Sequence, residues 1–171
     1  MKITFHGAAG MVTGSQTQVE HHNFSILVDC GLYQGPKKIR ELNWNLPKNQ
    51  HEIKAMILTH AHIDHSGLVP RWVASGWRGS IYVTPATARL LRVMLPDAAR
   101  LQEEDAYYAN RTKYSHHDPA LPLYTEKDAE KSFQLFKSCD YDQWVTLSPS
   151  MSFRFLRAGH ILGSAILQIQ Y

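Results

Sequence analysis

Three histidines and an aspartate crowd into six residues of this 171-residue chain. They are His60, His62, Asp64 and His65, within the segment THAHIDHSG at 59–67. Neutral imidazole nitrogens and carboxylate oxygens are suitable ligands for a borderline divalent ion such as zinc. The pattern therefore predicts a metal site. The competing interpretation is a polar helix N-terminus whose histidines are merely exposed to solvent.

The spacing divides these four residues into two pairs. His60 and His62 are two positions apart, so in an extended segment their side chains point the same way and can share one ion. Asp64 and His65 begin the following turn, where they can face a second ion nearby. Two ions in one site can activate a water molecule at neutral pH and stabilise the leaving oxygen of a phosphodiester or another ester.

Two residues far from this segment are candidates to complete the site. His160 lies in AGHILGSA at 158–165 and would supply the third histidine that the first ion needs. By itself, a histidine between two strands is more often structural than a ligand. Asp29 ends an apolar stretch, and its carboxylate could accept a hydrogen bond from a ligand imidazole and orient that ring. On spacing alone, an ordinary turn residue is an equally good interpretation of Asp29.

The elements around these residues predict a rigid platform for them. Strands are predicted at 2–6, 15–20, 24–29, 55–59, 80–84, 143–147, 152–157 and 164–171. Helices are predicted from a cap at Asp64 or Ser66 to 75, at 85–111 with a kink or break at Pro96, and at 125–137. The strand at 55–59 stops at His60, at the edge of the sheet. The mixed order of strands and helices predicts a layered α/β or α+β sandwich.

Composition narrows the classes of protein further. Hydrophobic residues make up 44% of the chain, enough for one domain with a core, and the net charge of +3 is compatible with a nucleic-acid partner without requiring one. Cys30 and Cys139 form no CxxC pair, which argues against a zinc-thiolate site or a disulfide framework and favours a reduced, cytoplasmic setting. The first residues contain no apolar signal region, and no apolar run is long enough to cross a membrane.

Four segments resemble a known superfamily. HAHIDHSG at 60–67 resembles the HxHxDH signature of metallo-β-lactamase-fold hydrolases, and the resemblance covers essentially the whole chain. GAAGMVTGS at 7–15, LVDCG at 27–31 and AGHILGSA at 158–165 are similar to the β-CASP branch, which processes RNA. The resemblance implies an α/β fold with αββα layers. We expect residues 1–171 to be its N-terminal portion, with the β-CASP domain and the C-terminal part of the fold absent.

The resemblance also implies a role for each candidate residue. It implies a first zinc ion held by His60, His62 and His160, a second held by Asp64 and His65, and support from Asp29. Asp64, His65 and Asp29 are accordingly the residues to which it gives catalytic roles. Two zinc ions are expected per complete site. The bridging aspartate and the last histidine ligand of the family are expected to lie beyond Tyr171.

The function implied is that of a metal-dependent hydrolase. We expect a ribonuclease or exonuclease that cleaves single-stranded RNA through a hydroxide bound by two zinc ions, with this chain alone inactive. Endonucleolytic and exonucleolytic cleavage are both open, and a homodimer is compatible with the sequence. One alternative is another hydrolase of the same fold, such as a DNA nuclease or a thioesterase. Another is a non-catalytic module that binds metal or RNA.

Overall fold

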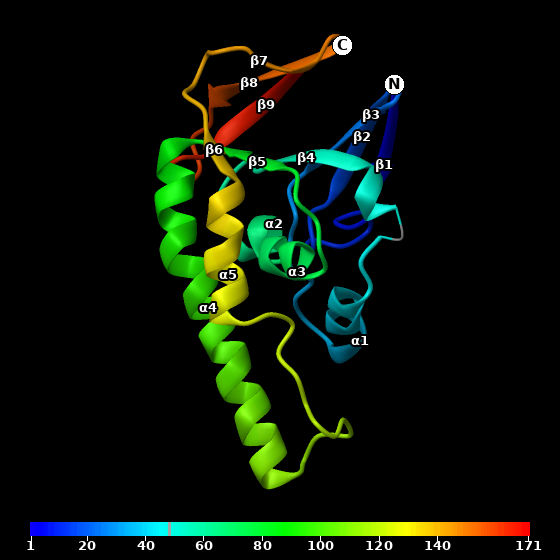
Figure 1. The fold of residues 1–171 in the computed structure, drawn as a ribbon, viewed down its shortest axis with the longest axis vertical. Coiled ribbons are helices and arrows are strands. Elements are labelled where there is room, and N and C mark those ends of the chain that lie inside the picture. The colour runs from blue at the N-terminus through cyan, green and yellow to red at the C-terminus, as the bar shows by residue number, and fades with distance from the viewer. Residues whose placement is uncertain (48) are drawn as a thin grey trace.

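The computed structural model describes residues 1–47 and 49–171, which form two β-sheets and a layer of helices (Figure 1). The larger sheet contains, in spatial order, β1 (Lys2–Phe5), β2 (Thr17–His21), β3 (Phe24–Val28), β4 (Ile53–Ile57), β5 (Ser80–Val83) and β6 (Phe136–Ser138). The smaller sheet contains β7 (Val145–Ser148), β8 (Met151–Arg157) and β9 (Ala165–Gln170). The helices are α1 (Lys37–Arg40), α2 (Ile63–Ser66), α3 (Val69–Ala74), α4 (Pro85–Thr112) and α5 (Glu126–Ser132). Single 3-10 turns lie at Glu41–Trp44 (η1), Gln50–Glu52 (η2) and Phe133–Leu135 (η3).

The larger sheet changes from antiparallel to parallel pairing at β3. β1, β2 and β3 are neighbours in sequence and pair antiparallel, whereas β3 to β6 pair in parallel. Parallel neighbours need long crossover connections, and here these carry the helices. The carboxyl ends of β3, β4 and β5 therefore meet at one edge of the sheet, and four of the candidate metal ligands, His60, His62, Asp64 and His65, follow β4.

Successive side chains of the central strands point to opposite faces of the larger sheet, and they belong to two separate hydrophobic cores. Leu27 and Met56 lie in the core beneath the helices, together with Trp72, Leu91 and other fully buried side chains. Their neighbours Ile26 and Ile57 point to the opposite face, where they pack against the smaller sheet. Successive side chains of a strand point to opposite faces, so a central strand covered on both sides is apolar throughout.

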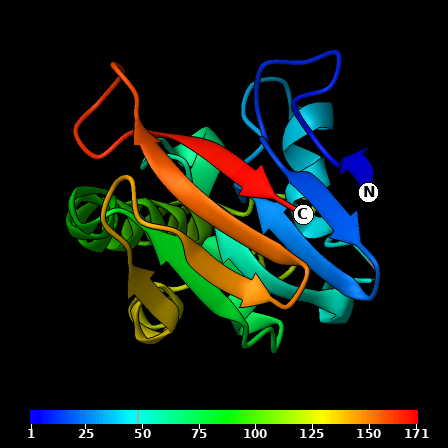
Figure 2. The same ribbon diagram turned by 90° about the horizontal axis from the view of Figure 1, so that it is seen from above.

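The smaller sheet lies across the face of the larger one that the helices leave free (Figure 2). Phe153 and Phe155 of β8 are fully buried between the two sheets. This arrangement confirms the mixed α/β class. Among the described residues it provides three layers, helices, sheet and sheet; the fourth, helical layer of the expected αββα sandwich is not found in them.

The structure corrects two of the helix predictions. The helix predicted from Asp64 or Ser66 begins instead at Ile63. It is also divided into α2 and α3, because the amide of Leu68 does not donate to a carbonyl of the same helix but to the carbonyl of Cys30, at 2.9 Å. Conversely, α4 runs unbroken through Pro96 for 28 residues. The fully buried Leu95 and Ala99 on either side of that proline hold both halves of the helix against the core.

The third helix and one strand also differ from expectation. α5 ends at Ser132, five residues before the predicted end at 137, and the segment 136–138 forms the strand β6, which was not predicted. Phe136 pairs there with Ile81 of β5, so a long-range pairing overrides the local preference. β4 ends at Ile57, and Thr59 lies beyond the strand instead of closing it.

Candidate metal centre

The segment 58–65 carries most of the candidate ligands and is fixed to the turn after β3. Cys30 donates its amide to the carbonyl of His65 at 2.7 Å, and Ser15 donates to the carbonyl of Asp64 at 2.8 Å. The two backbones lie so close that a Cβ at Gly31 would come within 1.7 Å of the Asp64 carbonyl oxygen. Only glycine fits at this position, and the close approach brings Asp29 next to the histidines.

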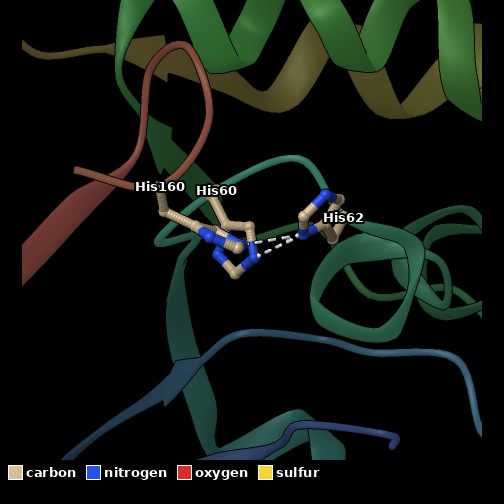
Figure 3. A group of neighbouring side chains, drawn as sticks. All are labelled: His60, His62 and His160. Atoms are coloured by element: carbon tan, nitrogen blue, oxygen red, sulfur yellow. Dashed lines mark hydrogen bonds between the residues drawn. The ribbon is translucent and has the colours of Figure 1, made fainter. Parts of the chain in front are cut away.

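Three imidazole rings converge from two distant segments (Figure 3). His62 Nδ1 lies 3.1 Å from His60 Nε2 and 3.1 Å from His160 Nε2. One ligand atom of each ring lies within 4.8 Å of the others. His60 is buried, His62 is half-buried and His160 is exposed, so the cluster opens to solvent on the His160 side.

The loop that carries His160 is anchored to the first turn of α4. Gly163 accepts hydrogen bonds through its carbonyl from the hydroxyls of Thr84, at 2.7 Å, and Thr87, at 3.0 Å. A second anchor is the amide of Ala165, which donates to the carbonyl of Thr59 at 2.9 Å. These bonds fix the start of β9 beside the end of β4, and this is why a histidine about a hundred positions away reaches His62.

Asp64 and His65 form a second group beside the first. His65 Nε2 lies 3.7 Å from Asp64 Oδ2, and the ring centroids of His65 and His60 are 4.1 Å apart. The other ring nitrogen, His65 Nδ1, lies 2.7 Å from Asp29 Oδ2. The second group therefore has one imidazole nitrogen and one carboxylate turned toward each other, directly adjacent to the three-histidine cluster.

Asp29 determines which ring nitrogen carries the proton in two imidazoles. It is 4% exposed and accepts hydrogen bonds from the Thr59 amide at 2.8 Å, from the Thr59 hydroxyl at 3.0 Å and from His65 Nδ1. The Thr59 hydroxyl, having donated its proton to the carboxylate, can only accept from His60 Nδ1 at 2.9 Å. Both Nδ1 atoms thus carry the protons, and the Nε2 lone pairs of His60 and His65 remain free to bind a metal ion.

Burial and neighbouring charges shift the pKa values of these two histidines in opposite directions. Burial, together with the neighbouring His65, His62 and His160, lowers the pKa of His60 to about 4 against a partial opposing effect of Asp29. Burial also lowers the pKa of His65, but the hydrogen bond and charge of Asp29 and the charge of Asp64 outweigh it, and the net shift is upward. His60 is consequently neutral at physiological pH, as a metal ligand must be.

The nitrogens of the cluster fit a metal ion. Ring nitrogens that approach to 3.1 Å repel one another through their lone pairs unless a proton or a metal cation lies between them. The two separations of 3.1 Å, from His62 to His60 and from His62 to His160, are close to the edge, roughly 3.4 Å, of a tetrahedron of nitrogens about 2.1 Å from zinc, and all three ligand atoms lie within 4.8 Å of one another. Cys30 does not join the donor set, because its side chain is fully buried in the hydrophobic core beneath the helices, where burial raises the pKa of its thiol well above the usual value.

All six residues singled out from the sequence therefore lie together. The first group comprises His60, His62 and His160, the second comprises Asp64 and His65, and Asp29 lies behind both. Sequence reasoning gave no role to Thr59, although its hydroxyl connects Asp29 to His60. Its place directly before the first histidine was the only available signal.

Comparison with known proteins decides the family. A family model described as the metallo-beta-lactamase superfamily domain matches residues 18–171. This chain belongs to the metallo-β-lactamase superfamily. As a member of that superfamily it carries the HxHxDH segment at 60–65, which begins on the loop after β4 and ends in α2, and His160 lies on the loop before β9.

Curated relatives indicate the branch of the superfamily to which this chain is similar. It is 32% identical to ribonuclease TTHA0252 of Thermus thermophilus over 99% of this chain and 35% of the relative. It is 26% identical to the transcription termination factor FttA of Methanocaldococcus jannaschii over 99% of this chain and 25% of the relative. An RNase J-like protein of the same archaeon is 25% identical over 98% of this chain and 33% of the relative. These relatives confirm the resemblance to the β-CASP RNA-processing branch, and the chain spans between a quarter and about a third of their length.

Solved structures support the same fold. The metallo-β-lactamase-fold protein YhfI of Bacillus subtilis matches with a TM-score of 0.52 and 18% identity over 98% of this chain and 56% of that protein. A Cronobacter sakazakii metallo-β-lactamase with a HARLDQ motif matches with a TM-score of 0.54 and 17% identity over 92% of this chain and 53% of that protein.

Among the described residues, no helix combines the length and the apolar character needed to cross a membrane.

Proposed function

We propose that these residues form the metal-binding part of a zinc-dependent RNA hydrolase. The observation that carries the proposal is the convergence of His60, His62 and His160, whose ligand atoms lie within 4.8 Å of one another. In this proposal these three histidines hold the first zinc ion, and Asp64 and His65 contribute to the second. Zinc is proposed over other divalent ions because a site rich in imidazole suits it.

The chain's own residues prepare the site in a defined way. Asp29 holds His65 directly and His60 through Thr59, so that the Nε2 lone pairs of both rings are free and would bind the ions. Asp64 supplies negative charge on the His65 side, and the exposed His160 side leaves room for substrate to approach. When bound, two zinc ions would supply an acidified water and stabilise the oxygen that leaves the phosphodiester.

RNA is proposed as the substrate because of the relatives. Ribonuclease TTHA0252 and the RNase J-like protein carry this activity in their names. We propose single-stranded RNA, exonucleolytic cleavage, a cytoplasmic location and a homodimer as the full description to be tested. The activity is assigned to the complete gene product, because the relatives are far longer than this chain.

A second candidate is a role in ending transcription. It is favoured by the similarity to FttA of Methanocaldococcus jannaschii, which is named a transcription termination factor. In that case, cleavage would be confined to nascent RNA, or the site would bind RNA without cutting it.

The test is cleavage of labelled single-stranded RNA by the complete gene product loaded with zinc. Single-stranded DNA and a glutathione thioester serve as competing substrates, and Asp64→Asn serves as the inactive control. We expect RNA to be cut at least about 100-fold faster than either competitor, since a site built for one substrate loses a few kcal/mol with others. Intact RNA in the presence of bound zinc would contradict the proposal, and faster turnover of DNA or thioester would transfer it to the corresponding hydrolase.

A further inference from the structure

A cavity lies away from His60, His62 and His160 of the metal centre. It has a volume of about 670 Å³, opens to solvent and is lined by residues of η1, of the C-terminal half of α4 and of the segment 114–123. This size falls within the range of roughly 300–1,000 Å³ that is typical of ligand pockets. Its lining includes Glu41, Trp44, Asp105, Tyr114 and Leu121.

The length of α4 separates the cavity from the metal centre. Thr87 of the first turn contacts the His160 loop, whereas Asp105 lines the cavity 18 residues later. At about 1.5 Å per residue, the distance along the helix is roughly 27 Å. Figure 1 shows this half of α4 and the following loop extending away from β8 and β9. The cavity therefore takes no part in the metal site.

The walls of the cavity are aromatic, aliphatic and proline-rich. Trp44 is 45% exposed, and Tyr114 and Leu121 are each 64% exposed, so their apolar surface is available to a ligand. Pro119 and Pro122 complete the wall formed by the loop. Grooves lined by aromatic side chains recognise extended, proline-rich polypeptide segments, which lose little conformational entropy when they bind.

The side chain of Arg71 holds one wall of the cavity in place. The Arg71 guanidinium lies over the Trp44 ring at 5.3 Å from its centroid, and its Nη1 donates to the Leu123 carbonyl at 3.3 Å. Arg71 thereby ties η1 to the loop and holds the indole in place. The cavity is thus a built feature of the fold, since side chains of three elements are connected around it.

The charge of the lining is negative although the chain as a whole is positive. Glu41 and Asp105 are exposed, and within residues 1–47 and 49–171 neither carboxylate forms an ion pair or a side-chain hydrogen bond. The net charge of the chain is +3. Two free carboxylates beside aromatic rings favour a cationic ligand and repel the phosphates of RNA.

We propose that this cavity binds an extended, proline-rich polypeptide segment of a partner protein that carries an arginine. The prolines and apolar side chains of the partner would pack on Trp44, Tyr114 and Leu121. Its guanidinium would pair with Glu41 or Asp105. The cavity is then a docking site that is independent of the metal centre.

The test uses a ten-residue proline-rich peptide with one central arginine, titrated into the isotope-labelled chain and followed by backbone amide NMR. Matched probes are the same peptide with glutamate in place of arginine and a single-stranded RNA ten-mer. We expect saturable shifts at amides of the cavity with a Kd below about 1 mM, and binding of the glutamate peptide at least about tenfold weaker. Absence of saturable shifts, equal binding of both peptides, or equal shifts with the RNA would each overturn the proposal.

A pair of variants checks the carboxylates. The double variant Glu41→Gln/Asp105→Asn should weaken binding of the arginine peptide about tenfold. The control Glu104→Gln/Glu130→Gln removes the same charge from exposed residues of α4 and α5 that do not line the cavity, and it should bind as the original chain does. Equal weakening in both variants would reduce the effect to net charge and overturn the proposed site.

Discussion

At the scale of single residues, one buried carboxylate organises the candidate metal centre. Asp29 binds His65 directly and reaches His60 only through the Thr59 hydroxyl. A partner of this kind fixes the tautomer of a ligand imidazole and raises its affinity for metal. The sequence pointed to Asp29 as a supporting residue, but the bridge through Thr59 depends on the distance between two loops and could not be predicted.

Replacing Thr59 tests this bridge. Thr59→Val keeps the shape of the side chain and removes the hydroxyl, so His60 Nδ1 loses its acceptor. We expect zinc affinity to fall about 10- to 100-fold. Thr59→Ser restores the hydroxyl and should restore most of the affinity. Competition with a chromophoric chelator measures both, and unchanged affinity in Thr59→Val would show that the bridge is dispensable.

The order in which two histidines take up protons is a second prediction at this scale. In the metal-free chain, His65 should protonate first on acidification, and His60 should stay neutral until about pH 4. Because the unfolded ring titrates near 6.5, the unfolded chain binds a proton to His60 that the folded chain excludes. His60 therefore lowers stability as pH falls from 6.5 toward 4. For His65 the sign is reversed, since its raised pKa adds stability that is lost as pH rises past that pKa.

Imidazole nitrogen NMR measures both titrations directly. His60→Gln should abolish the more acidic titration and leave the His65 signal in place. Protonation of His60 before His65 would contradict the electrostatic description of the site.

At the scale of elements, the centre depends on segments that dock closely onto one another. The turn after β3 lies against α2 at Gly31, and the His160 loop lies against the first turn of α4 at Gly163. Strand alternation and the ends of β4 and β5 could be predicted within about two residues. β6 and the division between α2 and α3 could not, because pairing with β5 and the bond to Cys30 are long-range contacts.

Substitution of Gly31 tests the docking. In Gly31→Ala the new Cβ would meet the backbone of Asp64 at 1.7 Å, and neither backbone can retreat without breaking bonds to Ser15. We expect a loss of about 3 kcal/mol or more in the free energy of unfolding, measured by urea denaturation. Gly159→Ala, whose Cβ would meet nothing within 4 Å, is the control and should change stability by less than about 0.5 kcal/mol. Similar stabilities of the two variants would refute the close approach.

At the scale of the whole molecule, two sheets join to bring His160 to His60 and His62. The ligands of the first group come from the larger sheet and from the loop before β9 of the smaller one, so the cluster exists only when the sheets are packed together. Zinc should therefore stabilise the folded chain, because binding that is confined to the folded state adds to the free energy of unfolding. The sequence pattern predicted these ligands, whereas no feature of the sequence predicted the cavity at the far end of α4.

The zinc content of the purified chain, measured by elemental analysis after dialysis against zinc-containing and then metal-free buffer, tests the central claim most directly. We predict about one to two zinc ions per chain, and a loss of at least about one ion in His62→Ala, which removes the nitrogen shared by both contacts of the cluster. His117→Ala, in an exposed loop, is the control and should retain the full content. Zinc at trace levels in the original chain, or full zinc content in His62→Ala, would contradict the assignment of these histidines as the metal centre.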